Sequence, residues 1–389
     1  MALFILIGHA SASLRTLRAI AVCAAVLAAG ALFAVHPQPA AANSTACHHV
    51  HGPFRVKGRH MLTRDGHRFT PYGVNVTTLR RVHGSYDSSV AAQVTEEDAA
   101  ATAWCANLVR LGAAQEKLII HDKVNHAYLS AIETSISHAE HDGLAVALTL
   151  DQTARSAVRL PVRRTLLAWQ DLTYHYGHDP QVIFDIFNEP TGPWSLWRNG
   201  GRSGGRRYYG MQHHAKMIRS HGGHNLLWVE GRNRASLLTG IPRWHLSGVG
   251  PLAYSEHRPR GAHTAASWTD SFGFLATRYP VVEGEWANYS RAPGAWACWR
   301  NAPVTVPRFL NYLAKHGLGL VAYDLTRPKL LESASFTDPN HIRGDWSCRK
   351  RLNEGAGHQI MSWLTRHNGS RLTVATALQP RLAALMRIS

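Results

Sequence analysis

The chain has 389 residues, of which 45% are hydrophobic and 17% charged, which is enough for a large globular domain with a sizeable core. Its 42 lysines and arginines against 25 acidic residues give a formal net charge of +17. The arginines are spread along the chain and no nucleic-acid-binding motif accompanies them, so we expect no nucleic-acid partner; association with an anionic cell surface is the alternative use of this charge.

The first 42 residues have the pattern of a secretory signal peptide. Arg15 and Arg18 precede a small-apolar stretch, Ala19–Val35, and three alanines ending at Ala42 follow it. We expect cleavage near Ala42, with Ala34 as the alternative site. A retained membrane anchor is the rival interpretation, but the apolar stretch is short for a bilayer. The sequence therefore predicts a secreted protein with no membrane span after cleavage.

Residues 43–70 are expected to form an N-terminal extension that ends in a β-hairpin. The segment Phe54–Phe69 has the pattern of strand, turn and strand, and Asp65-Gly66 supplies the turn. Residues 369–389 follow the last predicted barrel unit as a C-terminal tail. Leu378, Leu382 and Leu385 recur there at helical spacing, which indicates a possible packing helix.

Between these segments, residues 71–368 alternate apolar runs with amphipathic stretches. The predicted strands are Tyr72–Asn75, Ala106–Arg110, Leu144–Leu150, Val182–Phe187, Leu226–Glu230, Leu252–Ser255, Val281–Glu285 and Leu318–Tyr323. The predicted helices are Glu96–Ala103 with Thr95 as N-cap, Val124–Glu140, Arg163–Tyr176, Tyr208–His221, Trp268–Arg278 and Val306–His316. Eight strand–helix repeats favour a closed α/β barrel, the (β/α)8 TIM barrel. An open doubly wound sheet is the alternative, although no Gly-x-Gly-x-x-Gly motif supports it.

Four cysteines remain after signal cleavage, which is an even number in an exported chain and predicts two disulfides. They are Cys47, Cys105, Cys298 and Cys348. Three pairings are possible, and we favour Cys47–Cys105 with Cys298–Cys348 because each pair brackets one region of the chain. No cysteine pair has zinc-site spacing, and the 25 histidines are scattered, so we predict no metal site.

Two of the predicted strands end in a carboxylate. The apolar run Gln181–Phe187 is followed by Asn188-Glu189-Pro190, so Glu189 lies at a strand tip, partly desolvated, as suits a proton donor. The run that begins at Val281 ends in Glu285, and Glu283 is its rival because strand alternation places both on one face. Two glutamates facing each other across a barrel suit glycoside hydrolysis, which needs no cofactor.

With these motifs the chain resembles glycoside hydrolase family 5, the cellulase-like members of a large clan of retaining (β/α)8 enzymes. The segment Val182–Pro190 carries the resemblance, which extends from the N-terminal hairpin to the eighth strand. It implies Glu189 as the general acid/base and Glu285 as the nucleophile. Asn188 matches the residue that hydrogen-bonds the sugar 2-hydroxyl, and Arg110 the arginine that holds the nucleophile ionised. The implied substrate-binding residues are Asn188, Arg110, His257 and Trp286.

The chain departs from the family pattern around these residues. Pro259 replaces the tyrosine of a His-x-Tyr motif, Asp151-Gln152 stands where the third strand has a histidine, and Tyr323 replaces a tryptophan platform on the eighth strand. We therefore expect a secreted, monomeric retaining endo-β-glycosidase acting on a β-linked polysaccharide or oligosaccharide that is not necessarily cellulose. A catalytically degenerate barrel that binds glycans without hydrolysing them is the alternative.

Overall fold

The computed structural model describes residues 45–82, 85–152, 156–257, 264–287, 289–292, 295–298, 302–326, 329–331, 333, 335–339 and 356–371. The predicted signal peptide, the predicted C-terminal packing helix, Pro259 and Cys348, hence the second predicted disulfide, lie outside these residues.

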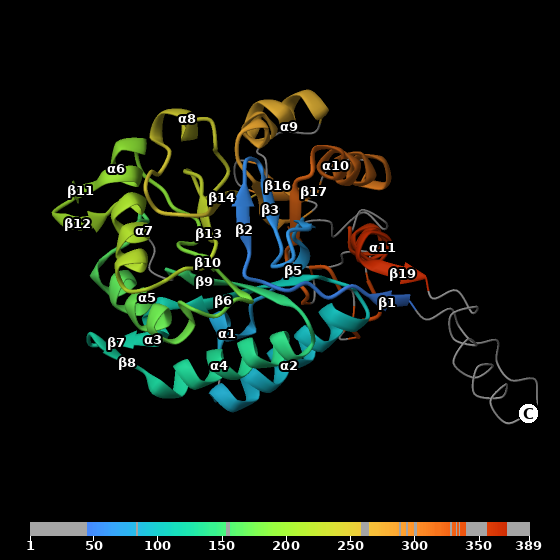
Figure 1. Cartoon of the computed structure of the whole chain (residues 1–389), viewed down its shortest axis with the longest axis horizontal. Helices are drawn as coiled ribbons and strands as arrows, with labels where there is room; N and C mark the ends of the chain where they lie inside the picture. Colours follow the sequence, from blue (N-terminus) through green and yellow to red (C-terminus); the bar gives the residue numbers. More distant parts are fainter. Residues whose placement is uncertain are drawn as a thin grey trace, which may run out of the picture. The chain divides into compact units, whose positions relative to one another are not determined.

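Eight strands form a closed barrel in which every neighbouring pair is parallel (Figure 1). They are β5 (Tyr72–Val76), β6 (Leu108–Ala114), β9 (Ala145–Asp151), β10 (Val182–Asp185), β13 (Leu227–Glu230), β14 (Leu252–Glu256), β15 (Val281–Trp286) and β18 (Gly319–Ala322). Each of the eight predicted strands is present, so the prediction of a (β/α)8 barrel is confirmed.

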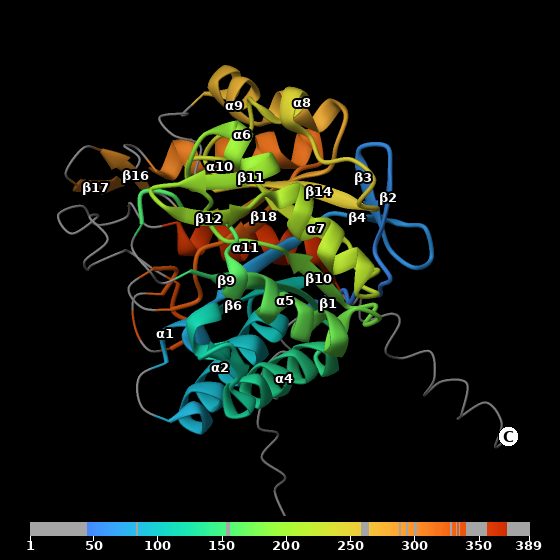
Figure 2. The ribbon, with the colours of Figure 1, turned by 90° about the vertical axis from the view of Figure 1, so that its left-hand side faces the viewer.

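The strands are apolar runs because both of their faces are buried. Figures 1 and 2 show α2, α4, α5 and α7 arranged around the outside of the strands. The helical elements are α1 (Thr78–Arg81), α2 (Tyr86–Thr102), α3 (Gln115–Leu118), α4 (His126–His141), α5 (Arg163–Tyr176), α6 (Trp194–Asn199), α7 (Met211–Ser220), α8 (Ile241–Trp244), α9 (Ala265–Ser271), η1 (Gly273–Thr277), α10 (Ala302–His316) and α11 (Gly357–Asn368). Among the described residues, none of the helices combines the length and apolar character that a bilayer crossing requires.

One predicted helix start was wrong. Helix α2 begins at Tyr86, ten residues before the predicted Glu96, because Ser85 is the N-cap and its Oγ accepts the backbone N–H of Ser88 at 3.2 Å. The expected N-cap, Thr95, lies inside the helix and donates its hydroxyl to the Ala91 carbonyl. Glu96 is therefore a buried residue of the helix interior rather than a first-turn acid.

The segment Pro193–Arg207, which follows the fourth strand, has regular structure. It contains the helix α6 and an antiparallel hairpin, β11 (Gly200–Ser203) and β12 (Arg206–Tyr209). Trp197 is buried and its Nε1 donates to the Glu230 carbonyl at 3.1 Å, so this tryptophan anchors the segment against the barrel.

A small N-terminal sheet closes the end of the barrel at which the strands begin. It has three strands, β2 (Arg55–Lys57), β3 (His60–Leu62) and β4 (Arg68–Phe69), one more than the predicted hairpin. The extra turn is at Gly58, which has a φ of 58°, and the predicted turn at Gly66 has a φ of 81°. Phe54, Met61 and Phe69 pack against side chains of the barrel interior and exclude water from its N-terminal end.

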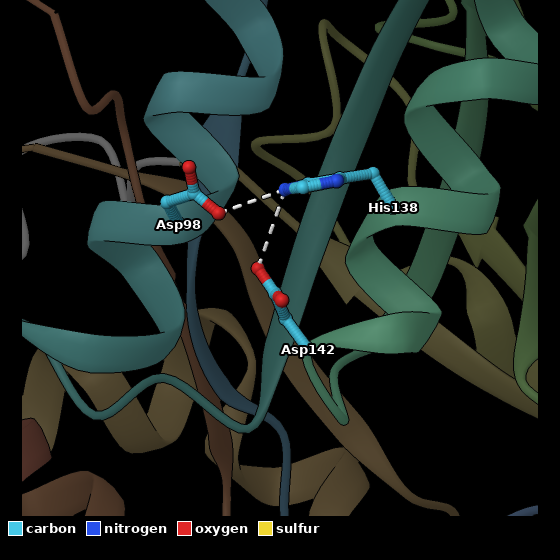
Figure 3. Close-up of side chains that lie close together, drawn as sticks. All are labelled: Asp98, His138 and Asp142. Atoms are coloured by element: carbon cyan, nitrogen blue, oxygen red, sulfur yellow. Dashed lines mark hydrogen bonds and ion pairs between the residues drawn. The ribbon is translucent and has the colours of Figure 1, made fainter.

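Helices α2 and α4 are also joined by a surface cluster of charged side chains (Figure 3). His138 Nε2 lies 2.8 Å from Asp98 Oδ1 and 3.5 Å from Asp142 Oδ2.

The described residues also contain two small hairpins. These are β7 (Ile119–Ile120) with β8 (Lys123–Val124) and β16 (Tyr289–Ala292) with β17 (Ala295–Cys298).

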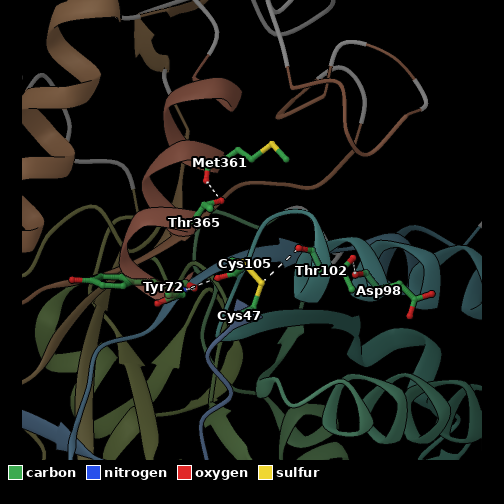
Figure 4. The surroundings of a disulfide bond; sticks show 8 residues. Cys47, Tyr72, Asp98, Thr102, Cys105, Met361 and Thr365 are labelled. Carbon is green, nitrogen blue, oxygen red and sulfur yellow. Dashed lines mark hydrogen bonds between the residues drawn. A yellow bond between two sulfur atoms is a disulfide. The ribbon is translucent and has the colours of Figure 1, made fainter. Parts of the chain in front are cut away.

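The predicted Cys47–Cys105 disulfide is present, with Cα atoms 5.1 Å apart (Figure 4). It joins β1 (Thr45–Cys47) to the segment before β6, and β1 pairs with β19 (Gly369–Arg371). Asn368 Nδ2 donates to the Cys105 carbonyl at 2.8 Å. The disulfide therefore ties β1, which pairs with the last described strand, to the start of the second barrel strand.

Replacing both Cys47 and Cys105 by serine should lower the free energy of unfolding by roughly 2–4 kcal/mol, since the bond closes a loop over a sequence separation of 58 residues. Urea denaturation of the oxidised protein and the double variant measures this difference. Equal midpoints and slopes for the two proteins would show that the bond does not constrain the unfolded chain.

Candidate active site

The two predicted catalytic glutamates meet at the C-terminal end of the barrel. Glu189 follows β10, and Glu285 lies near the end of β15. A carboxylate oxygen of Glu189, one of Glu285 and a ring nitrogen of His257 all lie within 4.8 Å of one another. Glu189 has a φ of 52°, in the left-handed region that few non-glycine residues adopt, so the chain turns sharply where this side chain is presented.

A β-bulge separates Glu285 from its rival Glu283. The pairing of β15 with β18 shifts between Glu283 and Trp286, so strand alternation is broken there. Glu283 is the register partner of Glu256 on β14 and lies near Tyr312 of the surrounding helix α10. The expectation that both glutamates share one face was therefore wrong, because the bulge turns only Glu285 toward the centre of the barrel.

The guanidinium of Arg110 lies beneath the two glutamates, fully buried, and uses all five of its N–H donors. Nη1 donates to Glu285 Oε1 at 2.7 Å and to Asn75 Oδ1 at 3.0 Å. Nη2 donates to Asn188 Oδ1 at 2.8 Å and to Glu230 Oε1 at 2.9 Å, and Nε donates to Asp185 Oδ2 at 2.7 Å. Arg110 thus holds Glu285, the predicted nucleophile, and Asn188 around its planar guanidinium group.

Burial and the charge of Arg110 act in opposite directions on the carboxyl groups around it. Burial raises the pKa of Asp185 to about 7 and the pKa of Glu230 to about 8, and the nearby Arg110 charge only partly opposes this effect. Arg110 also donates to Glu285 at 2.7 Å, a contact that favours the ionised form of that carboxylate.

Glu230 was not predicted as a site residue, but it supports both predicted catalytic glutamates. Its Oε2 accepts the backbone N–H of Glu189 at 2.5 Å, and its Oε1 lies 3.1 Å from His257 Nε2. A signal was available in the sequence: Leu226–Glu230 is an apolar run ending in a carboxylate, the same pattern as the run ending at Glu285. Glu230 holds the backbone of Glu189 in its left-handed conformation.

The predicted substrate-binding residues fall into two groups. Asn188 is close to both glutamates, and its Nδ2 donates to Asp151 Oδ1 at 3.2 Å. Arg110 and His257 are buried below the carboxylates, so they act on a sugar through the glutamates rather than by direct contact. Burial lowers the pKa of His257 to about 4, so its imidazole is neutral at neutral pH.

Trp286 is not in the pocket, contrary to the prediction. The bulge that turns Glu285 inward directs the next side chain outward, where the Trp286 ring stacks on Phe309 of α10 with centroids 4.9 Å apart. Its exposed fraction is 0%, so its role is packing between barrel and helix.

Tyr323 and Asp151, which stand where the family pattern has sugar-binding residues, are each held by charged neighbours. Tyr323 is 5% exposed, and Lys329 Nζ lies over its ring at 4.1 Å from the centroid, so it offers a sugar no open platform. Arg80, which no sequence motif marks, donates from Nη2 to the Tyr323 hydroxyl at 2.6 Å. Asp151 pairs with Arg159 Nη2 at 2.7 Å.

Comparisons with known proteins agree with this geometry. Among solved structures, a β-glucanase of Saccharophagus degradans in complex with cellotetraose superposes with a TM-score of 0.63 at 19% identity, covering 85% of this chain and 98% of its own. The catalytic domain of a Thermobifida fusca endoglucanase gives 0.57 at 16% identity, with 81% and 97% covered. A hyperthermophilic endocellulase of Pyrococcus horikoshii gives 0.54 at 16% identity, with 83% and 98% covered.

A search of the curated proteins found no match to this sequence. The family model for cellulase, glycosyl hydrolase family 5, matches residues 70–327, which include all eight barrel strands and both predicted catalytic glutamates. The chain therefore belongs to the cellulase family, glycosyl hydrolase family 5, and is a glycoside hydrolase built on a (β/α)8 barrel.

Proposed function

We propose that the protein is a secreted, retaining glycosidase that cleaves β-linked polysaccharides or oligosaccharides within the chain. The observation that carries this proposal is the short separation of Glu189 and Glu285, whose carboxylate oxygens approach within 4.8 Å. Retaining enzymes place their two carboxyl groups about 5–5.5 Å apart, whereas inverting enzymes leave room for a water at roughly 6.5–9.5 Å.

In the first step, a Glu285 oxygen attacks the anomeric carbon while the bond from that carbon to the leaving oxygen breaks. Glu189 transfers its proton to the leaving oxygen, and a covalent glycosyl-enzyme remains on Glu285. In the second step, the ionised Glu189 takes a proton from water, the water oxygen attacks the anomeric carbon, and the bond to Glu285 breaks. Two inversions give net retention.

The surroundings support these two roles. Glu285 receives an N–H from Arg110 at 2.7 Å, which stabilises its ionised form and orients it for attack. Asn188 is held by Arg110 on one side and donates to Asp151 on the other, a position from which it contacts a sugar hydroxyl at the cleavage point. A barrel that only bound glycans would not require this complete set of contacts around Glu285, so hydrolysis is favoured over binding alone.

Two of the solved structures resembling this fold contain cellotetraose, so a β-1,4-glucan is a reasonable first substrate to assay. Export is supported by the N-terminal sequence pattern and by the Cys47–Cys105 disulfide, since structural disulfides form in oxidising compartments.

When the complete sequence is expressed in a secreting host, the protein in the medium should begin at Asn43 and contain the oxidised Cys47–Cys105 pair. Intact-mass and peptide mass spectrometry test both points. Recovery of the uncleaved chain in the membrane fraction would instead support the retained-anchor interpretation.

Glu285→Gln should lower kcat by at least about 10⁴-fold on every substrate, because no nucleophile remains. Glu189→Gln should lose about 10²–10⁴-fold on unactivated oligosaccharides and less on aryl glycosides whose leaving groups need no proton. Initial rates with both substrate types, and NMR of the first-formed anomer, measure these effects.

Glu283→Gln is the matched control for these variants, since it lies on the same strand but faces α10. It should retain wild-type kcat on both substrate types. Near wild-type turnover by Glu285→Gln, or release of the inverted anomer by the wild-type enzyme, would contradict the assignment.

Glu230→Gln should lower kcat about ten- to a hundredfold with a small change in KM, because the amide N–H₂ must face either the Glu189 N–H or Arg110. One buried donor left unsatisfied costs about 1–3 kcal/mol. Since Glu230 holds Glu189, the loss should be larger for poor leaving groups than for activated aryl glycosides. An equal loss on both, together with a lower unfolding midpoint, would indicate only a structural role.

A further inference from the structure

Arg80 is a second arginine beside the nucleophile, and it approaches from a different direction than Arg110. It lies in α1, directly after β5, and its side chain is 13% exposed. Its Nη1 is 3.7 Å from Glu285 Oε1 and 3.7 Å from Asp151 Oδ2. Neither separation is a hydrogen-bond distance, so the N–H groups of Nη1 remain able to donate to an oxygen of a bound sugar.

Arg80 is not needed to anchor Glu285, because Arg110 already does so with a direct hydrogen bond. Besides Glu285, its acidic neighbours are Asp151 and Asp324. Asp151 directs Oδ1 to Arg159 at 2.7 Å and to Asn188 at 3.2 Å, and Asp324 accepts Lys329 Nζ at 2.6 Å. Glu285 and Asp151 each have an oxygen 3.7 Å from Arg80, whereas Asp185 and Glu230 are bonded to Arg110.

Further arginines lie outside the pocket. The segment that follows Arg159 is fixed by backbone hydrogen bonds from Thr191 N to the Arg159 carbonyl at 2.9 Å and from Tyr209 N to the Pro161 carbonyl at 2.7 Å. It leads to the start of α5, which lines a surface groove of about 310 Å³ together with residues of β12. The charged residues lining this groove are Arg163, Arg164, Arg206, Arg207, Glu116 and Asp122.

We propose that the preferred substrate is an acidic β-glycan, a polysaccharide bearing uronate carboxylates, one of which is bound by Arg80 beside the nucleophile. Further carboxylates along the same chain bind in the arginine groove. Arginine suits this role because its planar N–H donors match the two oxygens of a carboxylate. The net charge of +17 raises the rate of encounter with such a polymer. The inference rests on the proposed function and names its substrate class.

The test compares two substrates that differ only in charge: cello-oligosaccharides, and the same oligosaccharides with C6 hydroxymethyl groups oxidised to carboxylates. The wild-type kcat/KM should be at least tenfold higher on the oxidised form. Arg80→Met should remove about ten- to a hundredfold of that preference, as expected for one charge-assisted hydrogen bond, and Arg80→Lys should retain part of it. Replacing Arg206 and Arg207 together by methionine should raise KM on long oxidised chains.

Arg59→Met is the matched control, since it removes one positive charge in the turn between β2 and β3, at the N-terminal end of the barrel. It should leave the ratio of the two kcat/KM values unchanged. Equal kcat/KM on both substrates, or an equal loss on both in Arg80→Met, would overturn the inference and leave Arg80 as a positioning residue for Glu285, with the proposed hydrolase function intact.

If neither substrate is hydrolysed, the proposed activity on β-1,4-glucans fails, and binding still tests the inference. Calorimetry with Glu189→Gln should then show tighter binding of the oxidised oligosaccharide, weakened by salt and by adding Arg80→Met. Equal affinity for the neutral and oxidised forms would overturn it.

Discussion

The active site depends on one buried cation. Arg110 lies inside the barrel with three carboxylates and two amide oxygens around it, and each of its five N–H groups has an acceptor. A buried guanidinium is stable only with such complete pairing, and removing one partner of a buried pair costs about 3–5 kcal/mol. The acceptors come from β5, β10, β13 and β15 and from the residues just after β10. Closing the barrel and assembling the site are therefore the same event.

Two local departures from regular backbone complete the arrangement. The bulge in β15 turns Glu285 toward Arg110 while Glu283, two residues earlier, remains beside Glu256 and the outer helices. The left-handed φ of 52° at Glu189 turns the chain sharply after the fourth strand, and Glu230 holds that conformation by accepting the Glu189 N–H. Regular strands would present these side chains on fixed alternating faces, so the irregularities set the distance between the two glutamates.

The extent to which sequence predicts this structure follows from the range of each interaction. All eight strands were predictable because burial on both faces demands continuous apolar runs, and the tips of those runs identify Glu189 and Glu285. The start of α2 was missed because the cap at Ser85 outweighs the acidic pair after Thr95. The outward position of Trp286 follows from a bulge, which is a property of strand pairing that one segment cannot reveal.

The position of Arg80 could not be predicted from the sequence either, and it bears on which substrate the site prefers. Nothing in its local sequence marks it, because its contacts with Tyr323, Asp151 and Glu285 come from residues far along the chain that the barrel brings together. Glu285 is held by Arg110 deep in the barrel, whereas Asp151 and Tyr323, at the ends of their strands, differ from the family pattern. A hydrolase in which Lys329 covers the ring of Tyr323, and arginines line the pocket, no longer favours the flat apolar face of a neutral glucan. Its pocket instead favours charge, so the chemistry can stay constant while the class of substrate changes.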